Sequence, residues 1–206
     1  DIQTARTLLG ISNGLIRKGL VREALPQAEE ALAISLKAAG EDSIDAALAY
    51  ANVGEAHRDS GRPERALPLF RKSRALYEKA LGPEHPRVAS LLSQEGLILV
   101  QDGKLSLAEQ SMVKAVKMIR KTCPDCVLEL AIAENNLGVL RLRQKRYRDA
   151  DDSLSNAVAL REKFESRPGP QLAESLEYLA IAREKQRLFR DAARLSTRAE
   201  AIRAYR

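Results

Sequence analysis

The sequence "NVGEAHRDSGRPERALPLF", residues 52–70, decides the fold because it recurs along the chain. It aligns without gaps with four other segments: "GISNGLIRKGLVREALPQA" (10–28), "QEGLILVQDGKLSLAEQSM" (94–112), "NLGVLRLRQKRYRDADDSL" (136–154) and "YLAIAREKQRLFRDAARLS" (178–196). Two columns contain only alanine, namely Ala24, Ala66, Ala108, Ala150 and Ala192, and Ala5, Ala47, Ala89, Ala131 and Ala173. A constant period of 42 residues therefore predicts a repeat array.

Each repeat has the pattern of a helix, a tight turn, a second helix and a longer loop. One column has only small residues, as a close helix crossing requires: Ser12, Gly54, Gly96, Gly138 and Ala180. Another has only large apolar residues, as the core side of a second helix requires: Ile34, Leu76, Met118, Leu160 and Ile202. Gly19, Gly61 and Gly103 lie between the two helices, where glycine can adopt the left-handed conformation that ends a helix.

The composition is that of an all-α chain. Apolar residues make up 45% and charged residues 30%, while aromatic residues reach only 4%. No apolar run is long enough to span a membrane. The net charge of +6 makes nucleic acid or an acidic protein conceivable partners.

The repeat columns resemble the tetratricopeptide repeat, through Gly54, Ala66, Ala150, Tyr147 and Phe189. "NNLG" (135–138), "ALPLF" (66–70) and "LGPEHPRVA" (81–89) are similar to the kinesin light chain subclass, which also has a 42-residue repeat. The resemblance implies one right-handed α-α superhelix over residues 1–206, with repeats at about 1–46, 47–88, 89–130, 131–172 and 173–206. It also implies that Tyr147 and Phe189 are buried.

The resemblance further implies a concave groove that is lined by the first helix of each repeat. Side chains carried over to that face are Arg6, Asn13, Arg17, Asn52, Glu55, Asp59, Gln94, Gln101, Asn136, Arg143, Tyr178 and Lys185. Asn52, Gln94 and Asn136 are spaced by one repeat, and amides can donate to and accept from the backbone of an extended peptide. The alternative is that these positions form a solvated face.

"CPDC", residues 123–126, lies in a predicted loop between repeats. Cys123 and Cys126 can close a local disulfide or remain an idle thiol pair, and a metal half-site or redox switch is the alternative. The two histidines, His57 and His85, are not spaced as partner ligands, so we expect no metal site and no other cofactor.

The run "RLRQKRYRDADD", residues 141–152, is either a phosphate-binding patch or a turn whose charges neutralise one another. We expect the second, because single-strand binding also needs stacking aromatic side chains. Neither a glycine-rich phosphate loop, a nucleophile elbow nor a zinc-binding helix motif is present, so the sequence does not predict an enzyme.

The sequence thus predicts a non-enzymatic scaffold that binds an extended, partly acidic peptide of another protein. The alternatives are a nucleic-acid-binding solenoid that uses the basic C-terminal repeats, and a self-assembling structural module. We expect neither nucleic acid nor a membrane span, and slightly favour a monomer. Localisation stays open, because a periplasmic or secreted protein would require a cleaved leader and an oxidised Cys123–Cys126 pair.

Overall fold

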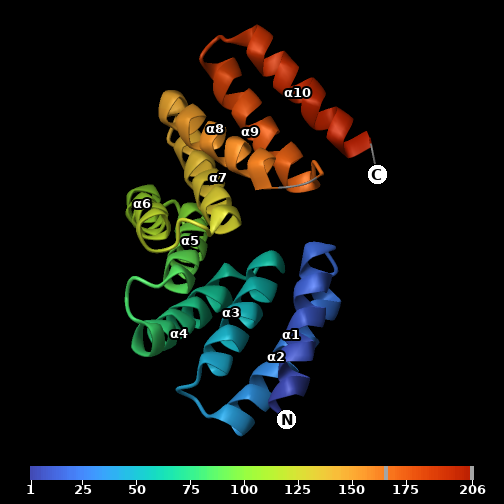
Figure 1. Cartoon of the computed structure of the whole chain (residues 1–206), viewed down its shortest axis with the longest axis vertical. Helices are drawn as coiled ribbons and strands as arrows, with labels where there is room; N and C mark the ends of the chain where they lie inside the picture. Colours follow the sequence, from blue (N-terminus) through green and yellow to red (C-terminus); the bar gives the residue numbers. More distant parts are fainter. Residues whose placement is uncertain (165–166, 205–206) are drawn as a thin grey trace. The chain divides into compact units, whose positions relative to one another are not determined.

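Figure 1 shows a computed structural model that describes residues 1–164 and 167–204. Residues 165, 166, 205 and 206, which fall in the fourth and fifth predicted repeats, lie outside the described residues. The described residues form ten α-helices and no strand: α1 (Ile2–Arg17), α2 (Val21–Ala39), α3 (Ile44–Asp59), α4 (Pro63–Leu81), α5 (Pro86–Gln101), α6 (Leu105–Thr122), α7 (Val127–Arg143), α8 (Tyr147–Phe164), α9 (Pro170–Lys185) and α10 (Phe189–Ala204). The all-α fold and the two helices per repeat are therefore confirmed.

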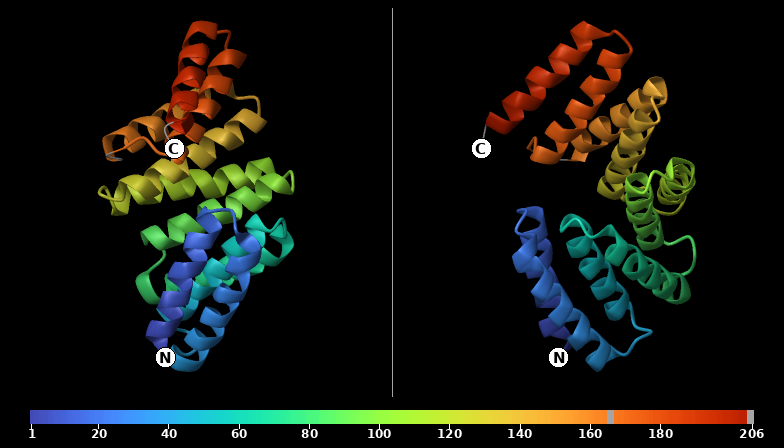
Figure 2. Two further views of the ribbon diagram at one scale, coloured as in Figure 1. Left: turned by 90° about the vertical axis from the view of Figure 1, so that its right-hand side faces the viewer. Right: turned by 180° about the vertical axis from the view of Figure 1, so that it is seen from behind.

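The chain forms two compact units, Asp1–Ile98 and Leu99–Arg206, which divide within α5. In the first unit, α1 packs on α2, α2 on α3, and α3 on α4. Its paired helices run antiparallel, as the two views in Figure 2 also show. Leu9, Ala31 and Ala49 form one of its buried clusters. The single array over residues 1–206 stays a prediction.

In the second unit, α7 packs on α8, α8 on α9, and α9 on α10, while α6 packs on α7. A buried cluster joins α8, α9 and α10, and Ala199 is its only residue from α10. Its members are Ala150, Leu154, Val158, Leu172, Ala173, Leu176, Leu179, Ala182 and Ala199. Among the residues that the structure describes, no helix is long and apolar enough to cross a bilayer.

The turn inside each repeat requires a positive φ. Gly19, Gly61 and Gly103 have φ of +76°, +71° and +73°, as the sequence predicted. In the last two repeats the same position is occupied by Lys145 (φ 60°) and Arg187 (φ 63°). The left-handed turn is therefore kept even where glycine is absent.

The small-residue column lies where the two helices of a repeat cross. A Cβ atom on Gly138 would lie 2.5 Å from Cγ of Leu154, and one on Gly54 would lie 2.8 Å from Cε1 of Phe70. Where the first helix instead has Ser12, the equivalent partner in the second helix is Ala28. A hydrogen bond from Ser12 Oγ to the Ala24 carbonyl (3.0 Å) then joins the helices.

The prediction that the aromatic column is buried is wrong for Phe189, which is 63% exposed. Its counterpart Tyr147 is half-buried, and the Tyr147 carbonyl accepts a hydrogen bond from the Gln186 side chain of the next repeat (3.2 Å). Phe189 starts α10, which no further described helix pair covers. The burial of this column therefore depends on the following repeat and not on the residue itself.

Candidate functional site

The first helices of the first unit hold one another through polar side chains of the predicted groove. Asn52 of α3 is 3% exposed and donates from Nδ2 to Oδ1 of Asn13 on α1. Arg6 of α1 forms a 2.9 Å ion pair with Asp45 of α3. These side chains bridge repeats, because each pair joins residues 39 positions apart.

A second polar cluster joins α3 to α5. Gln94 Nε2 donates to a carboxylate oxygen of Glu55 (3.3 Å), while the side-chain oxygen Oε1 of Gln94 accepts from Arg58. Arg58 also pairs with Asp59 at 2.7 Å. Burial raises the pKa of Glu55 above 4.5, and the Arg58 charge opposes that shift. Asn52 and Gln94 of the predicted ladder are thus engaged within the chain.

The predicted groove residues of the second unit are all exposed or half-buried. Gln101, Arg143 and Lys185 are exposed, while Asn136 and Tyr178 are half-buried. Tyr178 packs against the buried cluster around Leu176, and burial raises the pKa of its hydroxyl. In the first unit, Arg6, Arg17 and Asp59 are likewise exposed. The predicted groove residues thus include polar bridges between repeats, such as Asn52, and exposed side chains, such as Arg143 and Lys185.

Ile132 belongs to this face although it is not among the predicted groove residues. It is 48% exposed and lies one helical turn before Asn136 on α7, so the two share a helix face with Arg143. The signal was present in the sequence, because Ile132 occupies the same repeat position as Arg6.

Charged pairs between neighbouring repeats were also missed. Arg141 lies 3.9 Å from the Glu109 carboxylate, and Arg183 lies 3.3 Å from that of Asp151. In each pair the acid lies in a second helix and the arginine 32 residues later in the next first helix. The same spacing in both pairs would have revealed them.

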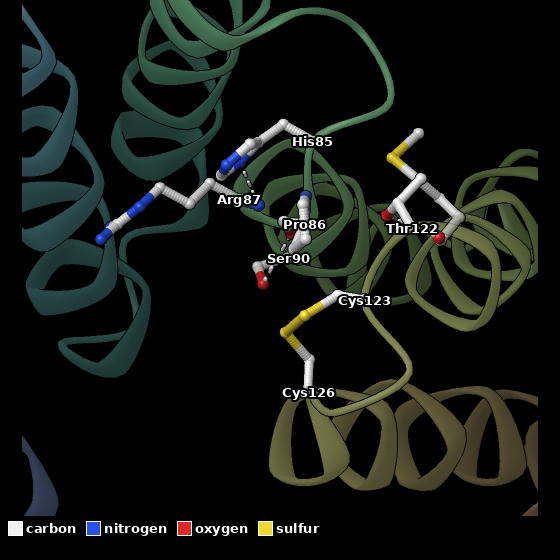
Figure 3. The surroundings of a disulfide bond; sticks show 8 residues. His85, Pro86, Arg87, Ser90, Thr122, Cys123 and Cys126 are labelled. Atoms are coloured by element: carbon white, nitrogen blue, oxygen red, sulfur yellow. Dashed lines mark hydrogen bonds between the residues drawn. A yellow bond between two sulfur atoms is a disulfide. The ribbon is translucent and has the colours of Figure 1, made fainter.

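Cys123 and Cys126 form a disulfide, which Figure 3 shows at the loop between α6 and α7. Cys123 follows Thr122 at the end of α6, and Cys126 directly precedes α7. A ring this small constrains the unfolded chain little, so its effect is local to the loop. In the described residues, no group of three or more His, Cys, Asp or Glu side chains could hold a metal ion.

The arginine-rich run at 141–152 is partly neutralised by its neighbours. Arg146 pairs with Asp149 at 2.7 Å and with Glu109 at 2.5 Å. Arg141 donates to Oγ of Ser153 at 2.7 Å. Two of the five cations in this run are therefore held by groups within the chain.

Comparison with known proteins identifies the repeat. The sequence profile described as tetratricopeptide repeat matches residues 3–79 and 45–121. The Clustered mitochondria protein homolog of Danio rerio is 23% identical over 177 residues, and the match covers 86% of this chain and 13% of that protein. The chain thus spans only a small part of this relative.

Solved structures share the fold. BtubC (BKLC) from P. vanneervenii superposes with a TM-score of 0.76 at 21% identity, over 99% of this chain and 87% of that chain. Nearly identical TPR-like repeats from a kinesin light chain-like protein of Podosopora anserina give a TM-score of 0.70 at 20% identity, over 100% and 97%. The APC/C hetero-tetramer Cut9–Hcn1 gives 0.72 at 15%, over 97% and 33%.

Antiparallel helix pairs at a 42-residue period define an α-solenoid of about five repeats, with kinesin light chain-like proteins among its structural neighbours. Such repeats typically serve as protein–protein interaction modules and are usually non-catalytic. The chain belongs to the tetratricopeptide repeat family, whose profile covers more than half of its length.

Proposed function

We propose that the chain is a non-enzymatic scaffold that binds an extended segment of another protein along its first helices. The observation that carries this proposal is the row of accessible side chains on α7 and α9, where Ile132, Arg143 and Lys185 are all exposed. An apolar side chain and two cations can together hold a segment that is apolar in one part and acidic in another.

The second unit supports this function better than the first. Asn52 and Gln94 of the first unit already bond to Asn13, Glu55 and Arg58, so a bound peptide would have to displace those bonds. Displacement leaves buried polar groups unpaired, which costs about 1–3 kcal/mol for each group. We therefore place the main contact on α7 and α9, with the amides of the first unit as supports between repeats.

A capture experiment tests the proposal. The triple variant Ile132→Ser, Arg143→Ser, Lys185→Ser changes only exposed side chains of first helices, so the helicity should be unchanged. A matched control, Leu107→Ser, Lys37→Ser, Lys114→Ser, removes one exposed apolar side chain and two exposed cations from second helices. Both are compared with the unmodified chain as bait in nuclease-treated lysate of the source cells.

We expect the unmodified chain and the control to capture the same protein, and the first-helix variant to lose it. Equal capture by all three baits would contradict the proposal, since the first helices would then contribute nothing to binding. In a parallel untreated lysate, capture that is seen only without nuclease would contradict it as well, because nucleic acid would then be the ligand.

A further inference from the structure

The turns of the last two repeats place cations at a costly backbone position. Lys145 and Arg187 have φ of 60° and 63°, where the earlier repeats have glycine. A side chain with a Cβ is disfavoured in this left-handed conformation, whereas glycine adopts it freely. Both side chains are exposed, so burial of the side chain does not offset that cost. Backbone strain of this kind is concentrated at functional positions.

These two turns touch each other. The side-chain amide of Gln186, next to Arg187, donates to the Tyr147 carbonyl at 3.2 Å and to an Asp151 carboxylate oxygen at 3.1 Å. The turn between α7 and α8 accordingly lies beside the turn between α9 and α10 in the views of Figures 1 and 2. The exposed cations in both turns and in the first residues of the helices that follow therefore share one surface, here called the basic edge. It consists of Lys145, Arg148, Arg187 and Arg190.

The carboxylates of the described residues do not neutralise the basic edge. Where the structure describes the chain, none of its four cations has a carboxylate within ion-pair distance, whereas neighbouring Arg146 and Arg183 are paired with Glu109 and Asp151. Asp149 is likewise occupied by Arg146. Arg143 and Lys185 end the adjoining first helices, so positive charge continues from the edge to the face that we propose for binding.

We propose that the basic edge binds a short acidic run of a protein partner, a site separate from the first-helix face. The inference rests on the proposed function only in taking the partner to be a protein. An arginine side chain can bind a carboxylate through two parallel hydrogen bonds, and three of the four cations are arginines. Two of these, Arg148 and Arg190, directly follow an aromatic residue in the sequence.

The carboxylates near the edge favour a peptide over other polyanions. Asp152 and Glu184 are exposed on the same helix pairs. An anionic bilayer or a nucleic-acid backbone presents negative charge uniformly, so it would also face these carboxylates and be repelled by them. A peptide can place acidic side chains opposite the cations and neutral ones opposite Asp152 and Glu184.

The test uses the double variant Lys145→Gly, Arg187→Gly, which restores the glycine of the earlier repeats. Because glycine suits this φ, loss of binding cannot be attributed to a damaged fold, and the melting temperature should equal or exceed that of the unmodified chain. The control Lys37→Gln, Lys114→Gln removes two exposed cations from α2 and α6. The probe is a labelled glutamate-rich peptide, followed by fluorescence anisotropy at low salt, with duplex DNA and phosphatidylserine vesicles as parallel probes.

We expect the peptide to bind the double variant about threefold to tenfold more weakly than the unmodified chain, from two exposed ion pairs lost. The control should bind as the unmodified chain does. Equal peptide binding by all three proteins, or equal loss in both variants, would overturn the inference. So would tighter binding of duplex DNA or vesicles that the double variant abolishes.

The outcome is separable from that of the proposed function. If the first-helix variant loses its captured protein while the double variant binds the acidic peptide normally, the proposed function stands and the basic edge is refuted. If the double variant alone loses the peptide and the first-helix variant still captures its protein, the basic edge stands and the first-helix face is refuted.

Discussion

The substitution Gly138→Ala tests how the two helices of a repeat fit together. The added Cβ would lie 2.5 Å from Cγ and 2.9 Å from Cδ2 of Leu154, whose side chain is fully buried. Carbon atoms in optimal contact are about 3.5–4.0 Å apart. Cγ is the branch point of the leucine, so rotation about the Cβ–Cγ bond cannot relieve the contact: either Leu154 changes its χ1 rotamer in the packed core or the helices move apart.

The expected loss follows from two opposing terms. Forcing an extra methyl group into a packed core costs about 1–3 kcal/mol. Alanine in place of glycine inside a helix returns about 1 kcal/mol. We therefore expect Gly138→Ala to lower the free energy of unfolding by roughly 1 kcal/mol.

The sign should reverse when Leu154 is shortened. Leu154→Ala alone should cost about 2–5 kcal/mol, because it leaves a cavity between α7 and α8. In that background the Cβ at position 138 has room, so Gly138→Ala should now stabilise by about 1 kcal/mol through helix propensity. The coupling between the two positions would then be about 2 kcal/mol, which is within the range for residues in contact.

Urea unfolding of the four proteins of this cycle provides the measurement. Far-ultraviolet circular dichroism is the suitable signal, because the chain is helical and has no tryptophan. Gly10→Ala is the matched control: a Cβ on Gly10 of α1 would meet no atom within 4 Å, so this change should stabilise. The reasoning is refuted if Gly138→Ala shifts stability in the same direction in both backgrounds.

Three further predictions concern the turns, a buried histidine and an ion pair. Lys145→Gly should raise the free energy of unfolding by up to about 1 kcal/mol, as left-handed strain is relieved against the greater freedom of glycine in the unfolded chain; a loss in urea unfolding would contradict this. Burial lowers the pKa of His57 below 6.5, so the unfolded chain binds the proton first and stability should fall as pH drops below about 6.5. His57→Leu should abolish that dependence in melts across this range, and an unchanged slope would assign it to other groups. Asp151→Ala should cost about 1 kcal/mol or less, because the Arg183 side chain that it leaves unpaired is 28% exposed; the cost should shrink when Arg183→Ala is already present.

Much of the fold could be predicted from the sequence because a repeat places every element at a fixed distance. The glycine column predicted the turns, as the structure shows. Identity within a column says nothing about contacts between columns, however. The repeat pattern thus predicts Asn52 as an accessible amide of the groove, whereas in the structure Asn52 is buried and bonded to Asn13.

The exposed Phe189 was mispredicted for a related physical reason. Its column is aromatic in two repeats, and an aromatic column suggests a buried position. In a solenoid, however, a side chain on the outgoing face of one repeat is covered only by the next repeat. The residue type of a column therefore indicates what the next repeat must pack against. It does not show whether each residue of the column is buried.

The pairing of acid and arginine columns shows what a finer interpretation of the sequence would use. The column of Glu109 and Asp151 contains Leu25 and Leu67 in the first two repeats, and the residues 32 positions later in the arginine column are His57 and Leu99. Acid and arginine thus appear together or not at all, because either charge alone would be left unpaired at a helix interface. The later repeats therefore use matched charges between neighbours, and the exposed cations Lys145, Arg148, Arg187 and Arg190 have no such match among the residues that the structure describes. That contrast is the reason to look for the missing carboxylates on a partner.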